Sequence, residues 1–179
     1  MISNAITLFR TGLALLLLGW LIIHGPGWVA LAVFLIAGGL DVLDGKLARA
    51  LNETSPLGAV LDLIGDRLLT LAAVLGLVAA DALPVWALPG AVVLVVRCIV
   101  VAGFSEALGP GQSLDQSRLE PLKIVTSFLG LSLAMLPFDA LGPVDLDILA
   151  GSIISLAGAL TLVTLVGYVR AAVARLRQG

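Results

Sequence analysis

Residues 41–66 read DVLDGKLARALNETSPLGAVLDLIGD, a polar stretch between two long apolar ones. It contains four aspartates in two pairs: Asp41 with Asp44, and Asp62 with Asp66. The members of each pair are three or four residues apart, which places them on one face of a helix. Residues 52–56 predict a short turn, because Thr54 or Ser55 can cap a following helix that has Pro56 in its first turn. The stretch therefore predicts two antiparallel neighbouring helices whose aspartates lie at a similar depth.

The composition of the whole chain indicates a membrane protein. Of its 179 residues, 60% are hydrophobic and only 12% are charged, which is too apolar for a soluble domain of this size. The net charge of -2 and the absence of a basic run argue against nucleic-acid binding. Cys98 is the single cysteine, so no internal disulfide is possible, and its apolar surroundings predict a small buried side chain.

Six stretches are apolar enough to cross a membrane, which takes about 20 residues each. They cover roughly residues 4–23, 28–51, 56–80, 85–107, 119–136 and 148–173. We therefore predict an all-α integral membrane protein, a polytopic bundle of six transmembrane helices. We expect residues 1–179 to form a single transmembrane domain.

The charges predict the orientation, because basic residues favour the cytoplasmic side of a membrane. With a cytoplasmic N-terminus, the inner ends hold the following basic residues: Arg10, Lys46, Arg49, Arg118, Lys123, Arg170, Arg175 and Arg177. The outer turns hold acidic residues instead: Asp81, Asp139, Asp145 and Asp147. This distribution predicts a multi-pass protein of the cell inner (cytoplasmic) membrane, with both termini and the four aspartates at the cytoplasmic face.

The four aspartates predict a metal site. Carboxylates are costly in hydrocarbon and repel one another, so we expect a cation among them. Hard oxygen ligands at this density suit Mg²⁺, Mn²⁺ or Ca²⁺, and four carboxylates suffice for two ions, an arrangement suited to transfer of a phosphoryl group. Arg49, one turn beyond Gly45, can offer a fork of donors to a phosphate. A single membrane aspartate is often a helix-end residue or half of an ion pair, but four at paired spacings favour the metal site.

The fixed positions of this stretch are Asp41, Asp44, Gly45, Ala48, Arg49, Gly58, Asp62 and Asp66. Their spacing resembles the pattern DxxDGxxARx8GxxxDxxxD of the CDP-alcohol phosphatidyltransferases, with every fixed position present. The stretch NAITLFR, with Asn4, Thr7 and Arg10, also resembles bacterial members of that family. The resemblance covers essentially the whole chain. It implies that a CDP-activated lipid, usually CDP-diacylglycerol, reacts with an alcohol to give a phosphodiester and CMP.

The resemblance also implies roles for the motif residues. The ligands of two Mg²⁺ or Mn²⁺ ions would be Asp41, Asp44, Asp62 and Asp66. The residues that bind CDP would be Asp41, Gly45, Ala48, Arg49, Gly58 and Asp62. Asp66 would also be catalytic, as the general base that takes the proton of the acceptor hydroxyl. A homodimer is expected, since dimers are common in the family.

Basic residues toward the inner halves of the helices predict an acceptor that carries a phosphate. The candidates for acceptor binding are Arg10, Arg67, Arg97, Arg118 and Lys123. Arg97 and the stretch Lys123-x2-Thr126 resemble features of members of the phosphatidylglycerophosphate synthase and cardiolipin synthase type. We therefore expect glycerol-3-phosphate as the acceptor, followed by phosphatidylglycerol; inositol phosphate and serine remain open. For Arg118 and Lys123 the alternative is positive-inside anchoring.

Two other classes of protein place acidic residues in membranes. Intramembrane prenyltransferases use aspartate-rich Mg²⁺ sites, but they have two separate motifs and more than six spans. A cation transporter would place its carboxylates near the middle of its spans, often on broken helices. The single compact motif near one end of its helices, with Arg49 beside it, speaks against both classes.

Overall fold

The computed structural model describes residues 2–51, 56–108, 120–137 and 145–176, and the side chains of these residues except at 2–7, 41–51, 56–66, 105–108, 120 and 175–176. All regular structure in the described ranges is helical, which confirms the all-α prediction. The elements are α1 (Ile2–His24), α2 (Trp28–Leu51), α3 (Pro56–Ala79), the 3-10 helix η1 (Val85–Ala87), α4 (Leu88–Leu108), α5 (Glu120–Ala134) and α6 (Leu146–Leu176).

The lengths of these helices bear on the prediction of six spans. Within the described residues, two segments are long and apolar enough to cross a membrane, Val85–Phe104 and Leu146–Ala174. The other apolar segments are shorter: Leu8–His24, Trp28–Leu40, Arg67–Ala79 and Pro121–Ala134. With 15 residues, α5 is about 22 Å long, which is less than the roughly 30 Å of a hydrocarbon core. The six helices are therefore present, and the six-span topology stays a prediction.

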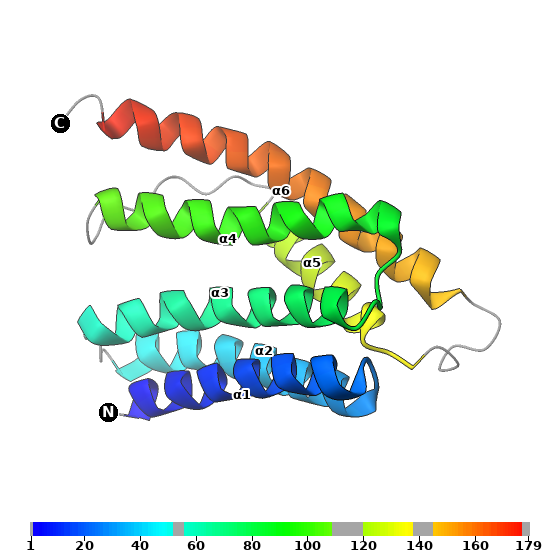
Figure 1. Ribbon diagram of the computed structural model, residues 1–179. Coiled ribbons are helices and arrows are strands. Elements are labelled where there is room, and N and C mark those ends of the chain that lie inside the picture. The colour runs from blue at the N-terminus through cyan, green and yellow to red at the C-terminus, as the bar shows by residue number, and fades with distance from the viewer. Residues whose placement is uncertain (1, 52–55, 109–119, 138–144, 177–179) are drawn as a thin grey trace.

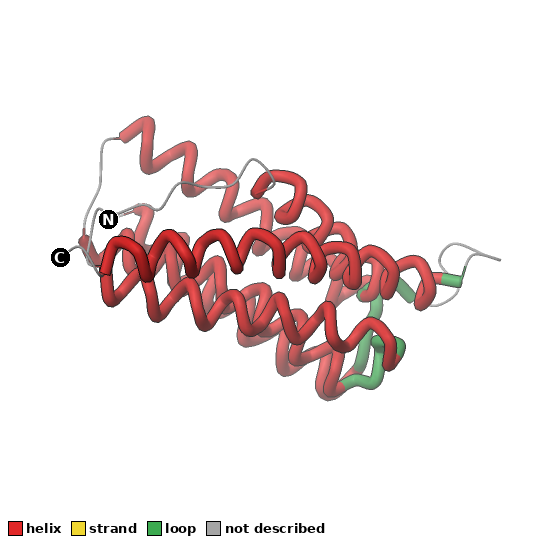
Figure 2. Tube along the Cα trace, turned by 90° about the horizontal axis from the view of Figure 1, so that it is seen from above, coloured by secondary structure: helices red, strands yellow, loops and turns green. Residues whose placement is uncertain are grey.

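The helices run side by side in an up-and-down bundle (Figure 1). The N-terminal ends of α1 and α3 and the C-terminal ends of α2, α4 and α6 lie at one end, which we call the motif end because residues 41–66 belong to it. The segments that join α1 to α2 and α3 to α4 lie at the opposite end, as the second view also shows (Figure 2). Thus α1, α3 and α5 run away from the motif end, and α2, α4 and α6 run toward it.

Packing divides the bundle into two groups of helices. In the first group α1 packs against both α2 and α3, and in the second α6 packs against both α4 and α5. Glycines allow close approaches between helices: a Cβ at Gly76 of α3 would lie 2.7 Å from Cδ1 of Leu21 on α1, and one at Gly158 of α6 would lie 2.5 Å from Cα of Gly90 on α4. Small residues are what helices in membranes use to pack closely.

Two residues with positive φ end helices at the end opposite the motif. Gly25 (φ 75°) follows α1, and its N–H donates to the carbonyl of Leu21 at 2.9 Å. Asp81 (φ 54°) follows α3, where the N–H of Ala82 donates to the carbonyl of Leu77 at 3.0 Å. This left-handed residue after a helix closes the last turn and satisfies carbonyls that would otherwise lack partners.

Candidate functional site

The two helices that carry the aspartates meet at the motif end. Asp41 lies ten residues before the last residue of α2, and Asp66 lies ten residues after the first residue of α3. At 1.5 Å per residue, both positions are about 15 Å from the ends of their helices, so the helix bounds agree with the predicted similar depth.

The side chains of the motif lie outside the described residues. This applies to Asp41, Asp44, Gly45, Ala48, Arg49, Gly58, Asp62 and Asp66, and Arg118 also lies outside the described ranges. Among the side chains that the structure does describe, no group of three or more His, Cys, Asp or Glu gathers. The ligand set for the metals and for CDP therefore stays a prediction.

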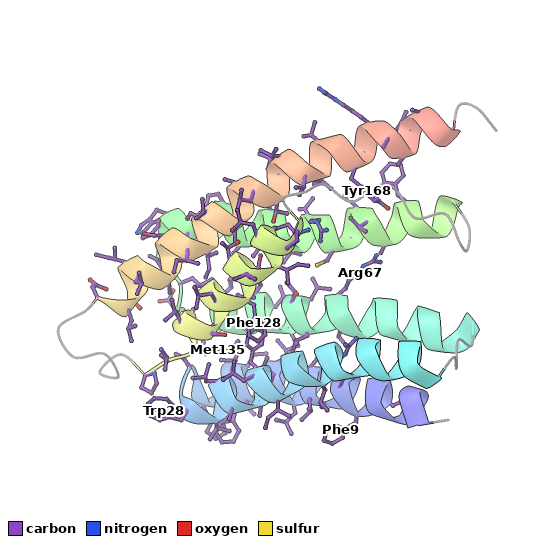
Figure 3. The ribbon with its side chains drawn as sticks, turned by 180° about the vertical axis from the view of Figure 1, so that it is seen from behind. Phe9, Trp28, Arg67, Phe128, Met135 and Tyr168 are labelled. Carbon is purple, nitrogen blue, oxygen red and sulfur yellow. The ribbon has the colours of Figure 1, made fainter. Side chains whose placement is uncertain are left out.

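Four of the five predicted acceptor-binding residues are described, and they come from four different helices. Arg10 of α1 is fully buried (0% exposed), and Lys123 of α5 is 3% exposed. Arg67 of α3 and Arg97 of α4 are partly buried. In Figure 3 the side chain of Arg67 reaches from α3 toward α4.

Three of these cations lie at nearly the same depth as the aspartates. Arg67 is eleven residues from the start of α3, Arg97 is eleven from the end of α4, and Arg10 is eight from the start of α1. Lys123 is three residues from the start of the shorter helix α5. The half of the bundle that includes the motif end therefore carries basic residues on α1, α3, α4 and α5.

The burial of Lys123 separates its two interpretations. Its neighbours Leu122, Ile124 and Val125 are 51%, 60% and 61% exposed, so α5 turns the lysine inward and its apolar neighbours outward. A lysine that served only to anchor the helix at the membrane surface would face outward instead. The hydroxyl of Thr126 donates to the carbonyls of Leu122 (2.9 Å) and Lys123 (3.0 Å), so it is held by the backbone of its own helix.

Buried charged side chains at this end of the bundle need compensating charges or hydrogen bonds. A charge removed from water costs several kcal/mol unless an opposite charge and hydrogen bonds compensate it. Because Arg10 and Lys123 are buried, each charge needs a compensating partner, and a carboxylate or the phosphate of a ligand would serve as one. Aspartates together with arginine and lysine residues at a similar depth in an apolar bundle are suited to binding a phosphorylated molecule.

Two residues near this end have contacts that the motif does not reveal. The spacing of the motif does not single out Gly38, although its position on α2 is covered by the ring of Phe128 from α5. The ring of Tyr168 on α6 lies edge-on to Phe104 of α4, with centroids 6.3 Å apart. In the sequence each of these contacts is marked by no more than a glycine or an aromatic residue in an apolar run, which does not identify the partner.

Comparison with known proteins gives consistent matches. A family model described as CDP-alcohol phosphatidyltransferase matches residues 1–174. The chain is 31% identical over 175 residues to the CDP-diacylglycerol--glycerol-3-phosphate 3-phosphatidyltransferase of Pseudomonas fluorescens, an alignment that covers 96% of this chain and 89% of that protein.

Cardiolipin synthases match over a shorter part of the chain. Identity is 43% over 93 residues to the cardiolipin synthase (CMP-forming) of Streptomyces coelicolor, which covers 48% of this chain and 42% of that protein. It is 42% over 85 residues to the cardiolipin synthase (CMP-forming) of Homo sapiens, which covers 47% of this chain and 28% of that protein. The chain thus spans less than half the length of these two relatives.

Proposed function

The chain belongs to the CDP-alcohol phosphatidyltransferase family, and on this premise we propose that it transfers a phosphatidyl group from CDP-diacylglycerol to an alcohol and releases CMP. The acceptor that we propose is glycerol-3-phosphate. The observation that carries this choice is the burial of Arg10 and Lys123 at the end of the bundle that also bears the aspartates.

The donor set fits divalent cations. Asp41 and Asp44 on α2 and Asp62 and Asp66 on α3 are hard oxygen donors on two antiparallel helices, and their helix ends coincide in the fold. We propose that they hold two Mg²⁺ or Mn²⁺ ions. When bound, such ions offset negative charge on a pyrophosphate and on the departing CMP.

The remaining residues of the motif would bind and orient the nucleotide. We assign CDP binding to Asp41, Gly45, Ala48, Arg49, Gly58 and Asp62. Among them, the guanidinium of Arg49 can donate two parallel hydrogen bonds to phosphate oxygens. Glycine and alanine let a ligand approach the helix backbone closely.

Asp66 is the residue that we assign to proton transfer. The acceptor hydroxyl oxygen forms a bond to the phosphorus of the phosphatidyl group, and the bond from that phosphorus to the oxygen shared with CMP breaks. The electron pair of the broken bond leaves with CMP, and the carboxylate of Asp66 takes the hydroxyl proton. The products are a phosphodiester and CMP.

The basic residues would select the acceptor. Arg10, Arg67, Arg97 and Lys123 offer positive charge from four helices, which suits a phosphate monoester with its two negative charges. We propose the same role for Arg118. A second candidate acceptor is phosphatidylglycerol, because the stretch that aligns with cardiolipin synthases is the more similar one, at 43% identity.

We further propose a setting for this reaction. The six helices would each cross the cell inner membrane, residues 1–179 would act as one domain, and two copies would form a homodimer. The charge distribution supports a cytoplasmic motif end, and so does the arrival of CDP-linked and phosphorylated molecules from the cytoplasm. Labelling of single cysteines at positions 25 and 81 from the outer side, in a Cys98→Ala background, tests this orientation.

The function can be tested with purified protein in lipid nanodiscs. The protein is supplied with CDP-diacylglycerol, with Mg²⁺ or Mn²⁺, and with one radiolabelled acceptor at a time. We expect CMP and phosphatidylglycerophosphate from glycerol-3-phosphate. Cardiolipin from phosphatidylglycerol would support the second candidate. Absence of CMP with glycerol-3-phosphate, phosphatidylglycerol, inositol phosphate and serine would refute the proposal. Asp66→Asn should bind CDP-diacylglycerol but release no CMP, whereas turnover by that variant would remove Asp66 as the base.

A further inference from the structure

The ring of Phe128 on α5 covers Gly38 on α2. A Cβ at Gly38 would lie 2.9 Å from Cζ of Phe128 and closer still to Cε2, so no side chain fits there unless the ring or the helix moves. The adjacent Gly39 is open, since a Cβ there would meet nothing within 4 Å. The contact is therefore specific to one face of α2.

The Phe128 ring has a second neighbour that restricts its movement. It stacks on Phe34 of α2, with ring centroids 4.8 Å apart and planes inclined by 22°. Phe34 is itself 2% exposed and belongs to the core. The Phe128 ring is thus held against α2 at two positions, one turn apart, and a group added at Gly38 has to push the two helices apart.

This contact lies between the two groups of helices. The first group is α1 to α3 and carries the aspartates, while α5 of the second group carries Lys123. Positions 34, 38 and 41 have the spacing of one helix face, so Asp41 stands one turn after Gly38 along α2. On α5, Lys123 precedes Phe128 by five residues.

We propose that Gly38 and Phe128 are positioning residues that set the spacing between the α2 aspartates and Lys123 of α5. The inference rests on the proposed function, in which these aspartates hold the metals and Lys123 binds the acceptor phosphate. Close packing at Gly38 fixes how near the acceptor lies to the phosphatidyl group. A misplacement of about 1 Å can lower the rate by a large factor.

The first test measures the spacing directly. Spin labels at Ile36 of α2 and Leu129 of α5, both exposed, report the distance between the helices in a Cys98→Ala background. We expect Gly38→Ala to lengthen this distance by about 1 Å, because carbon atoms in contact need about 3.5–4.0 Å. The double variant Gly38→Ala/Phe128→Leu should restore it. Gly39→Ala is the matched control and should leave the distance unchanged.

The second test separates the two substrates. In Gly38→Ala we expect KM for glycerol-3-phosphate to rise about tenfold, while KM for CDP-diacylglycerol changes little, because the nucleotide site belongs to α2 and α3 alone. The added Phe128→Leu should lower the acceptor KM again. If KM rises equally for both substrates, or if Phe128→Leu does not lower the acceptor KM again, the positioning role is overturned.

The two tests fail in different ways. If the wild-type protein releases no CMP with any acceptor, the proposed function fails, and the label distance still decides whether Gly38 sets the spacing of the helices. If the distance is the same in Gly38→Ala and wild type, the positioning inference fails even in an active enzyme. A longer distance with an unchanged acceptor KM also overturns it.

Discussion

The crossing of α4 and α6 offers a sharp test of the packing. A Cβ added at Gly158 would lie 2.5 Å from Cα, 2.9 Å from the carbonyl oxygen and 3.0 Å from the carbonyl carbon of Gly90. These neighbours are backbone atoms, which cannot rotate away as a side chain can. Because carbon atoms in contact need about 3.5–4.0 Å, Gly158→Ala has to separate the two helices by about 1 Å.

The loss of stability expected for Gly158→Ala follows from the same distances. Overpacking of a well-packed interior costs about 1–3 kcal/mol, and a backbone clash that cannot relax belongs at the upper end of that range. Separation also weakens the dispersion contacts along the crossing, on which helix association in a membrane depends. We therefore expect Gly158→Ala to lower the free energy of unfolding by about 2–3 kcal/mol.

The assay is unfolding of the purified protein by SDS in mixed micelles, followed by circular dichroism. Gly167→Ala is the matched control, because a Cβ at Gly167 of the same helix meets nothing within 4 Å. This control should be neutral or stabilising by up to about 1 kcal/mol, since alanine is the better helix former. If Gly158→Ala is no less stable than Gly167→Ala, the close crossing of α4 and α6 is refuted.

Three further predictions concern the helix ends, the metals and the acceptor. Gly25 and Asp81 both have positive φ, which glycine adopts more readily than other residues. In the same unfolding assay, Gly25→Ala should therefore lower the free energy of unfolding by about 1 kcal/mol, and Asp81→Gly should raise it by about 0.5–1 kcal/mol. Changes of the opposite sign would contradict this explanation. EDTA should abolish CMP release, and added Mg²⁺ or Mn²⁺ should restore it; activity that persists with EDTA would exclude the metal site. Lys123→Met should raise KM for glycerol-3-phosphate about tenfold without changing KM for CDP-diacylglycerol, and an equal change in both would assign the lysine a structural role.

The helices could be predicted because their ends carry local signals. Pro56 begins α3 in both prediction and structure, and α1 ends at His24, one residue beyond the expected position. The fourth helix was expected from residue 85, whereas η1 occupies 85–87 and α4 begins at Leu88. Pro89 accounts for this shift, since proline lacks an N–H and is tolerated only in the first turn of a helix.

The packing partners of each helix could not be predicted, because a glycine in an apolar run does not indicate which residue of another helix it contacts. Gly38 meets Phe128, Gly76 meets Leu21, and Gly158 meets Gly90, and each contact joins residues more than 50 positions apart in the sequence. Phe128 also stacks on Phe34, with ring centroids 4.8 Å apart. Cys98 was expected to be buried and is 8% exposed.

Some features of the candidate site follow from local sequence spacing, whereas others depend on how distant helices pack together. The aspartates were found from spacing alone, since both pairs lie within 26 residues of sequence, and the backbone of α2 and α3 supports their equal depth. The sequence could also identify Arg10 and Lys123 as candidates, but it could not predict their burial, which depends on how the helices pack together. Burial is the property that separates binding of an anion from anchoring at a membrane surface.

The division of the bundle into two groups suggests how acceptor choice could change without loss of the transfer chemistry. The aspartates belong to α2 and α3, which pack with α1, whereas Arg97 and Lys123 belong to the group formed by α4, α5 and α6. On the proposed function, substitutions on α4 and α5 would therefore alter the charge offered to the acceptor while the packing of α1 to α3 stays the same. The contact of Phe128 with Gly38 limits this freedom, because any change that moves α5 there also changes its spacing from α2.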